Sequence, residues 1–440
     1  MENSRLRFTL DQELHARPYI PLTNNLRVFQ FAFYTGEEEP QAEWSHLCQY
    51  LANLNAPELP MPTDKFFVVD VGDITLRYER HTEFTSLTLI YKDAIASNPS
   101  DGRPLLFTDT ATSSIPEHLI QTFPGQLLVA NWIEMVPDLH NVQAADIQTL
   151  FGHSNFAACG LPNGQGKVFM SFKLDHSHFA DDGFSRVLIE NPDLKPLRAG
   201  RLVQRIIEVE VYRVFALLSL PLVREQMVEL GRLEQEITCI SEAMTHSGLE
   251  EDGASVLSGE LERLSMVSAG IEKIAARTDY RLAATRAYDM LVQRRVEELR
   301  EIRLESYQTI NEFLQRRLAP AIRTCEAVSR RIDSLATRAN RVNNLLRTRI
   351  EMRIQTQNHD LLRSMESRAR AQLRLQEMVE GLSIAAITYY VISLLGYLLK
   401  GIKPDLLPWA PSSIQAAAVP LVALLIWLSI GVVRKQLKDH

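Results

Sequence analysis

The sequence predicts an α/β domain, then a long α-helical coiled-coil stalk, then two C-terminal transmembrane helices. Three observations lead to this fold class. Runs rich in Val, Ile, Phe and Tyr alternate with short helical patterns before residue 190, which is typical of a mixed sheet covered by helices. Helix-forming composition takes over after residue 200. Two uncharged apolar segments, 381–399 and 413–433, lie near the C-terminus.

The α/β domain is expected over residues 1–200. Strands are predicted at 26–34, 65–80, 84–92, 126–136 and 167–172, and helices at 40–54, 116–123 and 142–151. The segment 191–200 contains two prolines and a glycine, so we expect a linker that closes the domain.

A helical hairpin region is expected over 201–320 and a stalk helix over 321–380. Pro221 should kink the first helix. From 271 to 380 the sequence has no glycine and only one proline, which predicts a long helical run typical of a coiled coil or stalk. Apolar residues follow a 3,4 spacing at Cys325, Val328, Ile332, Leu335, Ala339, Val342 and Leu346. This seam needs a partner helix, from the same chain or from sister subunits.

The segment 381–433 is predicted to form a hairpin of two membrane-spanning helices. Each apolar segment is long enough to cross a hydrocarbon core of about 30 Å. Only a short proline-containing connection separates the two, and the alternative is a buried helical pair of a soluble protein. Arginines precede the first span, and a basic tail at 434–440 follows the second, so both termini are predicted to be cytoplasmic.

The charge of the chain indicates which partners to expect, and its cysteines indicate the redox state of its thiols. The net charge of -7 and the isoelectric point of about 5.9 argue against nucleic acid. Four cysteines stand singly, without a CxxC pair, which favours reduced thiols over a disulfide framework. The expected partners are a lipid bilayer and further copies of the chain.

Two polar motifs, ELHARP at 13–18 and ERHTEF at 79–84, form the candidate site. In extended chain, alternate residues point the same way. The side chains that would then converge are Glu13, His15, Arg17, Glu79, His81 and Glu83. They suit a divalent metal ion, another ligand or a proton-handling pair. Alternatively, the His and Arg side chains join the entry segment to the sheet by hydrogen bonds and ion pairs.

No nucleophile elbow, Cys–His arrangement or dinucleotide fingerprint occurs, so the sequence does not predict an enzyme. A metal-dependent enzyme tethered at the membrane is a third hypothesis, which rests on Glu13, His15, His81 and Glu83. Small and polar residues in the first span are candidates for a pore lining or a helix–helix interface. They are Ser383, Thr388, Tyr389, Ser393, Gly396 and Tyr397.

The order of these segments and the basic ending resemble the CorA family of two-span divalent-cation channels. In that family five subunits surround a pore lined by the first span, which ends in a Gly-Met-Asn signature. Here Gly396 stands at the Gly position, but Leu398 stands at the Asn position. The resemblance therefore implies a CorA-like build without the polar ring that selects magnesium.

The chain is also similar, over nearly its full length, to an uncharacterised bacterial family often described as membrane-anchored. ELHARP, ERHTEF and the segment 212–221 carry this resemblance. It implies a multi-pass protein of the bacterial cytoplasmic (inner) membrane and no particular activity. We therefore expect an oligomeric, ion-channel-like or transporter-like protein with a cytoplasmic sensing domain, not selective for magnesium. The alternative is a non-conducting scaffold or ligand-binding protein anchored in the membrane.

Overall fold

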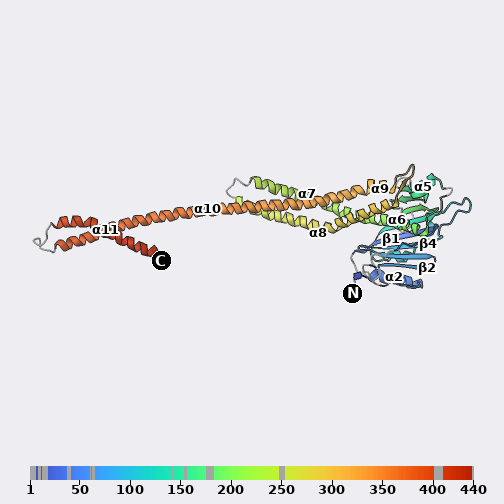
Figure 1. The fold of residues 1–440 in the computed structure, drawn as a ribbon, viewed down its shortest axis with the longest axis horizontal. Coiled ribbons are helices and arrows are strands. Elements are labelled where there is room, and N and C mark those ends of the chain that lie inside the picture. Colours follow the sequence, from blue (N-terminus) through green and yellow to red (C-terminus); the bar gives the residue numbers. More distant parts are fainter. Residues whose placement is uncertain are drawn as a thin grey trace. The chain divides into compact units, whose positions relative to one another are not determined.

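A computed structural model describes residues 6–7, 11, 18–36, 41–59, 61, 65–139, 142–152, 156–174, 183–246, 253–400 and 410–438 (Figure 1). The chain divides into two compact units. The first comprises Met1–Ala243 and Glu262–Val342, and the second comprises Met244–Leu261 and Asn343–His440. The first contains the sheet, and the second contains the two apolar helices.

A mixed sheet dominates the first unit. Its strands in the described residues are β1 (Leu26–Tyr34), β2 (Phe66–Val71), β3 (Ile74–Arg80), β4 (Phe84–Lys92), β5 (Gln126–Val136), β6 (Phe156–Gly160), β7 (Lys167–Ser171), β8 (Ser185–Glu190) and β9 (Ile302–Arg303). They lie in the order β2-β3-β4-β1-β5-β8-β7-β6-β9. The pair β5–β8 is parallel, and β1 pairs antiparallel with both β4 and β5.

The predicted strands agree with the sheet in part. β1, β4 and β5 coincide with the predicted runs, whereas the run 65–80 is divided into the hairpin β2–β3. Gly72 at the turn has a φ of 59°, a conformation that glycine adopts without strain. β6, β8 and β9 were not predicted. β9 has only two residues and lies in a region of helical composition.

Helices cover both faces of the sheet. One face packs against α2 (Gln41–Asn53), α3 (Asp109–Thr112), α4 (Glu117–Gln121) and α5 (Ala144–Leu150). The other face packs against α6 (Pro196–Leu217) and parts of three later helices, α8 (Gly253–Leu299), α9 (Ile310–Arg317) and α10 (Ala319–Lys400). The period of two in β1 explains this: Val28 and Ala32 enter one core, whereas Phe29 and Phe31 enter the other.

The remaining described helices are α7 (Ser219–His246), α8 (Gly253–Leu299), α9 (Ile310–Arg317), α10 (Ala319–Lys400) and α11 (Pro411–Lys438), and Pro162–Gly164 forms the short 3₁₀ helix η1. The predicted linker at 191–200 is corrected, because α6 already begins at Pro196 and contains Gly200. Proline suits the first helical position, since its missing N–H has no intrahelical partner there. The helix is interrupted at Leu218, between α6 and α7. This lies close to Pro221, where a kink is expected because the proline ring disfavours a continuous helix.

The helical run predicted over 271–380 is interrupted at 300–309. Helix α8 ends at Leu299, and the chain forms β9 before α9 begins at Ile310. Thr309 and Glu312 form a capping box: each side chain accepts a hydrogen bond from the other residue's backbone N–H.

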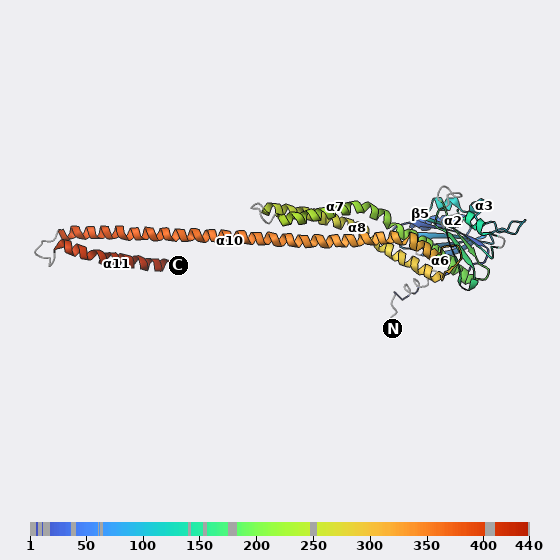
Figure 2. The same cartoon turned by 90° about the horizontal axis from the view of Figure 1, so that it is seen from above.

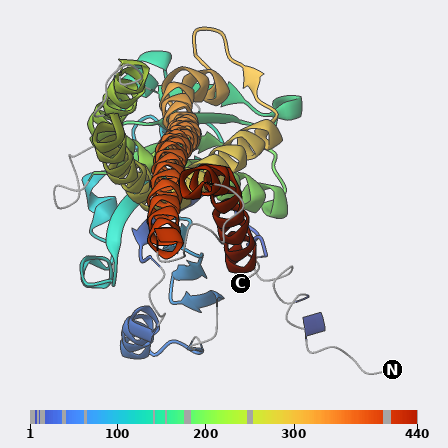
Figure 3. The same ribbon diagram turned by 90° about the vertical axis from the view of Figure 1, so that its left-hand side faces the viewer.

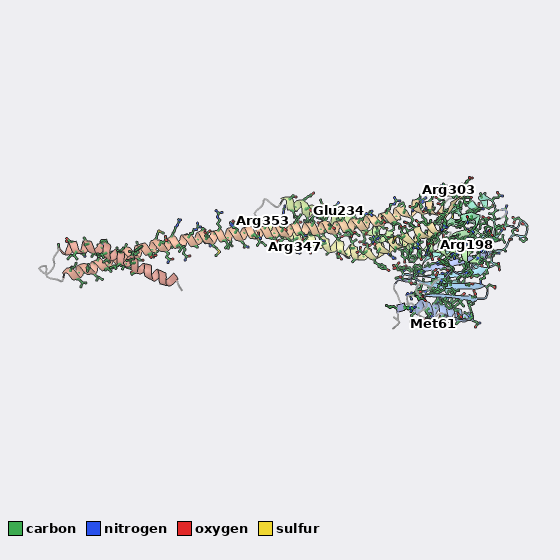
Figure 4. The ribbon with its side chains drawn as sticks, in the orientation of Figure 1. Met61, Arg198, Glu234, Arg303, Arg347 and Arg353 are labelled. Atoms are coloured by element: carbon green, nitrogen blue, oxygen red, sulfur yellow. The ribbon has the colours of Figure 1, made fainter. Side chains whose placement is uncertain are left out.

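The apolar seam of the stalk is buried against helices of the same chain in the first unit. Cys325, Ile332 and Leu335 are each less than 5% exposed. Arg331 and Arg338 of α10 form ion pairs with Glu234 of α7. Figures 1 and 3 show α7, α8 and α10 running side by side there, and Figure 4 labels Glu234. The partner of this part of the seam is therefore intramolecular.

In the second unit, α11 runs back along the last part of α10 (Figure 2). In the part of the chain that the structure describes, two helices are long and apolar enough to cross a membrane by length and composition. The most apolar window of the first helix is 6% buried. That of the second helix, Ser412–Ser429, is 0% buried. Large side chains such as Leu394, Leu421 and Trp427 are therefore exposed.

Candidate functional site

A row of buried polar residues crosses the sheet on the face covered by α6. Direct cross-strand pairing joins neighbours along the row, from β3 through β4, β1 and β5 to β8. Its members are Arg77, Thr88, Gln30, Asn131 and Ser185, each at most 4% exposed. Strand neighbours on this face, such as Val28 and Val129, belong to the apolar core, so the row interrupts that core with hydrogen-bonding groups.

Hydrogen bonds within the row are incomplete. Asn131 Nδ2 donates to Gln30 Oε1 at 2.6 Å, and Gln30 Nε2 donates to Ser86 Oγ at 2.9 Å. Among the described residues, Asn131 Oδ1 and Arg77 Nε are buried with no hydrogen-bond partner. A buried polar atom without a partner costs about 1–3 kcal/mol. The row therefore contains a buried acceptor and a buried donor that no described protein atom satisfies.

Glu79 lies beside this row. Its Oε1 accepts a hydrogen bond from Arg77 Nη2 at 2.6 Å, and both side chains are at most 5% exposed. The two residues are separated by two positions of β3 and so share a face. The Arg77 guanidinium also lies 5.1 Å from the centre of the Phe66 ring. Glu79 is therefore already engaged by a buried cation.

His81 and Glu83 do not continue the face of Glu79, which corrects the expected alignment. β3 ends at Arg80 and β4 begins at Phe84, so residues 81–83 form a turn. The His81 ring stacks on Phe84 with centroids 4.1 Å apart. Glu83 instead meets α8, where it accepts hydrogen bonds from Arg281 Nη2 at 2.5 and 2.7 Å and from the Tyr288 hydroxyl at 2.9 Å.

The surroundings of Glu83 keep it ionised. Burial alone would raise the pKa of its carboxyl, but hydrogen bonds from Arg281, Tyr280 and Tyr288 together lower that pKa below its ordinary value. Burial and the Glu83 charge in turn raise the pKa of Tyr288. A carboxylate with these three donors is a poor proton donor at neutral pH. Its hydrogen bonds with Arg281 and Tyr288 join the β3–β4 turn to α8, and we call this contact the clasp.

Glu13, His15 and Arg17 lie outside the described residues. The segment that follows them is described and docks on α6: Leu22 N donates to Pro196 O at 3.0 Å. No group of three or more His, Cys, Asp or Glu side chains that could hold a metal ion occurs in the described parts of the chain.

A third buried ion pair, which the sequence reasoning missed, lies on the opposite face of the sheet. Glu134 of β5 accepts hydrogen bonds from Arg27 Nε at 2.8 Å, Phe107 N at 2.8 Å and Trp132 Nε1 at 3.2 Å. Burial raises the pKa of Glu134, although Arg27 opposes this. The signal was present in the sequence, because each charge interrupts a long apolar strand run.

The candidate residues of the first span divide into two groups. Ser383, Thr388, Ser393 and Gly396 are buried or half-buried. The Ser383 and Thr388 hydroxyls donate to backbone carbonyls one turn earlier in their own helix. Tyr389 and Tyr397 are 71% and 73% exposed. The structure therefore does not bring all six residues together.

A family model described as "Protein of unknown function (DUF3422)" matches residues 2–437. The chain belongs to this family. No curated protein matches it. The family match agrees with the expected uncharacterised family, and its description assigns no activity that would transfer to the polar row or to the hairpin.

Gly396 of this DUF3422 protein marks a close contact between α10 and α11. A Cβ at this position would lie 2.1 Å from Nε2 of Gln415, and that same Nε2 donates to Ile392 O at 3.1 Å. Gly396→Ala should displace the Gln415 amide and break this hydrogen bond. Relative to an alanine substitution at an open position of the same helix, we expect a loss of about 1 kcal/mol in stability, measured by thermal unfolding.

Gly381→Ala is the matched control, because a Cβ there meets nothing within 4 Å in the same helix. Alanine is favoured over glycine in a helix by about 1 kcal/mol, so this variant should be neutral or more stable. Equal melting temperatures for the two variants would contradict the contact between Gly396 and Gln415.

Proposed function

We propose that this protein is anchored in a lipid bilayer by the hairpin of α10 and α11 and holds its sheet domain in the cytoplasm as a ligand-binding or sensing module. One observation supports the anchor above all others: the apolar windows of both helices are almost completely exposed. Exposed apolar area costs about 25 cal/mol per Å² in water, and a hydrocarbon environment removes this cost.

The proposed orientation follows the distribution of basic residues. Arg368, Arg370 and Arg374 precede the first span, and Arg434 and Lys435 follow the second. The positive-inside rule then places both ends of the chain in the cytoplasm of a bacterial cell, at its inner membrane.

An assembly of several copies is part of the proposal. Tyr389, Tyr390 and Tyr397 are 71%, 68% and 73% exposed on α10. A tyrosine hydroxyl in hydrocarbon is stabilised by a hydrogen-bond partner, and a neighbouring copy of the first span can supply one. Ion passage is the second candidate function, because a face of tyrosine hydroxyls shared among copies can line a narrow lumen.

The anchor is tested by fractionation. The full chain should stay with membranes after alkaline carbonate and high-salt washing, whereas a variant that ends at residue 380 should be released. Recovery of the full chain in the soluble fraction would contradict the anchor. Attachment through surface charge alone predicts release of both chains by high salt, since the Debye length is about 3 Å at 1 M.

Assembly and conduction are tested with purified protein. We expect a mass of at least three copies after correction for bound detergent, together with flux of K⁺ into liposomes that Tyr397→Leu reduces. Leu406→Ala, in the sequence connecting the two apolar segments, is the control variant, purified and reconstituted in the same way, and its K⁺ flux should equal that of the unmodified protein. Lack of flux for any mono- or divalent cation would exclude the channel and leave the anchored ligand-binding protein.

A further inference from the structure

Arginines line a cavity of about 350 Å³ in the first unit. Helix α6, the end of α8 and η1 form its walls. The charged residues that line it are Arg198, Arg201, Arg205, Arg300 and Glu298. Figure 4 labels Arg198. The spacing of 3 and 4 along α6 places the first three guanidinium groups on one side of that helix.

The one carboxylate in this lining is already neutralised. Glu298 accepts hydrogen bonds from Arg205, Arg294 and Arg295. Burial opposes ionisation of Glu298, but the neighbouring arginine charges lower its pKa overall. No additional anionic side chain lines the cavity in the described residues. The positive charge of the other arginines is therefore uncompensated.

Arg201 and Arg300 form no ion pair within the described part of the chain, and Arg198 Nη1 contacts only Gln165 Oε1, at 3.5 Å. Like charges gathered around one cavity repel one another, at a cost that a bound anion would remove. Guanidinium groups also match phosphate oxygens geometrically, because two parallel N–H groups can donate to two oxygens.

Arg300 occupies a position where its backbone favours another residue. It follows the last residue of α8 and has a φ of 51°, in the left-handed region usually taken there by glycine. A non-glycine residue in this conformation costs about 1 kcal/mol. Glycine would fit this backbone conformation without strain, yet the position carries the cationic side chain of Arg300.

The lining also indicates a soluble ligand in preference to a lipid. Its leucines, Leu161, Leu194, Leu202 and Leu299, are only 3–8% exposed. They therefore leave little apolar surface for an acyl chain. We infer that this cavity binds the phosphate or diphosphate group of a small soluble compound. The inference does not depend on the membrane anchor.

Isothermal titration calorimetry of the full chain in maltoside detergent tests this site, with inorganic phosphate and pyrophosphate as probes. We expect pyrophosphate to bind more tightly, because it can engage more guanidinium groups. Arg201→Gln and Arg300→Gln should each weaken binding roughly tenfold or more. Arg323→Gln removes an equal charge from an exposed position of α10 outside the cavity, and it should bind like the unmodified protein.

Arg300→Gly separates folding from binding. It relieves the left-handed backbone, so the melting temperature should be unchanged or higher, yet pyrophosphate binding should fall as in Arg300→Gln. Equal binding by all variants, or no binding, would overturn the proposal. If citrate bound with the same dependence on these variants and pyrophosphate did not bind, the ligand would not be a phosphate compound and the proposal would be overturned. Binding to vesicles containing phosphatidic acid, without binding of pyrophosphate, would overturn the soluble ligand.

Discussion

Replacing Glu83 by glutamine is expected to lower the free energy of unfolding by about 3–5 kcal/mol. Glu83 and Arg281 are 4% and 12% exposed at their side chains, and two hydrogen bonds join them. Glutamine keeps the shape of the carboxylate but removes its charge. Arg281 then stays buried beside Tyr288 without a counter-ion.

Urea denaturation at pH 7 measures this loss. Glu366→Gln is the matched control, since Glu366 pairs with Arg370 at side chains that are 61% and 71% exposed, and such pairs contribute about 0–1 kcal/mol. The double variant Glu83→Leu with Arg281→Met should recover much of the lost stability, because no unpaired charge remains. Equal effects of Glu83→Gln and Glu366→Gln would show that the clasp is not structural.

The pH dependence of this clasp has a defined sign. The pKa of Glu83 is lowered in the folded state, so its ionised form stabilises the fold above the unfolded-state pKa of about 4.3. This stabilisation is lost as the pH falls through the lower, folded pKa. The difference in unfolding free energy between the unmodified chain and Glu83→Gln should therefore be constant near pH 7 and shrink below about pH 4.

The fold of the sheet domain could be predicted where local pattern decides it. Strand β1 is rich in aromatic residues and has buried side chains on both faces, and its predicted bounds are those observed. The polar row could not be predicted in this way. Its assembly requires the pairing of Arg77 with Thr88 and of Gln30 with Asn131, which depends on the order of strands far apart in sequence.

The ERHTEF motif shows the same limit. Its polar residues could be singled out from the sequence, but the partner of Glu83 lies 198 residues further along the chain. Local extension suggested one shared face, whereas the turn at 81–83 separates His81 and Glu83 from Glu79. The break after α8 likewise has no glycine or proline. It depends on the pairing of β9 with β6, a tertiary contact, and only the capping box at Thr309 marks it locally.

Gly200→Ala should destabilise the protein by about 2–3 kcal/mol, against the helix propensity of alanine. A Cβ at Gly200 would lie 1.9 Å from the carbonyl oxygen of Ile20 and 3.0 Å from its carbonyl carbon. These atoms are backbone, so no side-chain rotation relieves the clash. The entry segment must then move away from α6, and the hydrogen bond from Leu22 N to Pro196 O should break.

Hydrogen exchange of the Leu22 amide, with the melting temperature, tests this directly. Exchange should accelerate in Gly200→Ala, and the melting temperature should fall. Gly259→Ala is the control, because Gly259 lies inside α8 and a Cβ there meets nothing within 4 Å. That variant should gain up to about 1 kcal/mol and leave Leu22 protected. If both variants are stabilised equally and Leu22 keeps its protection, the entry segment does not depend on α6 for its position.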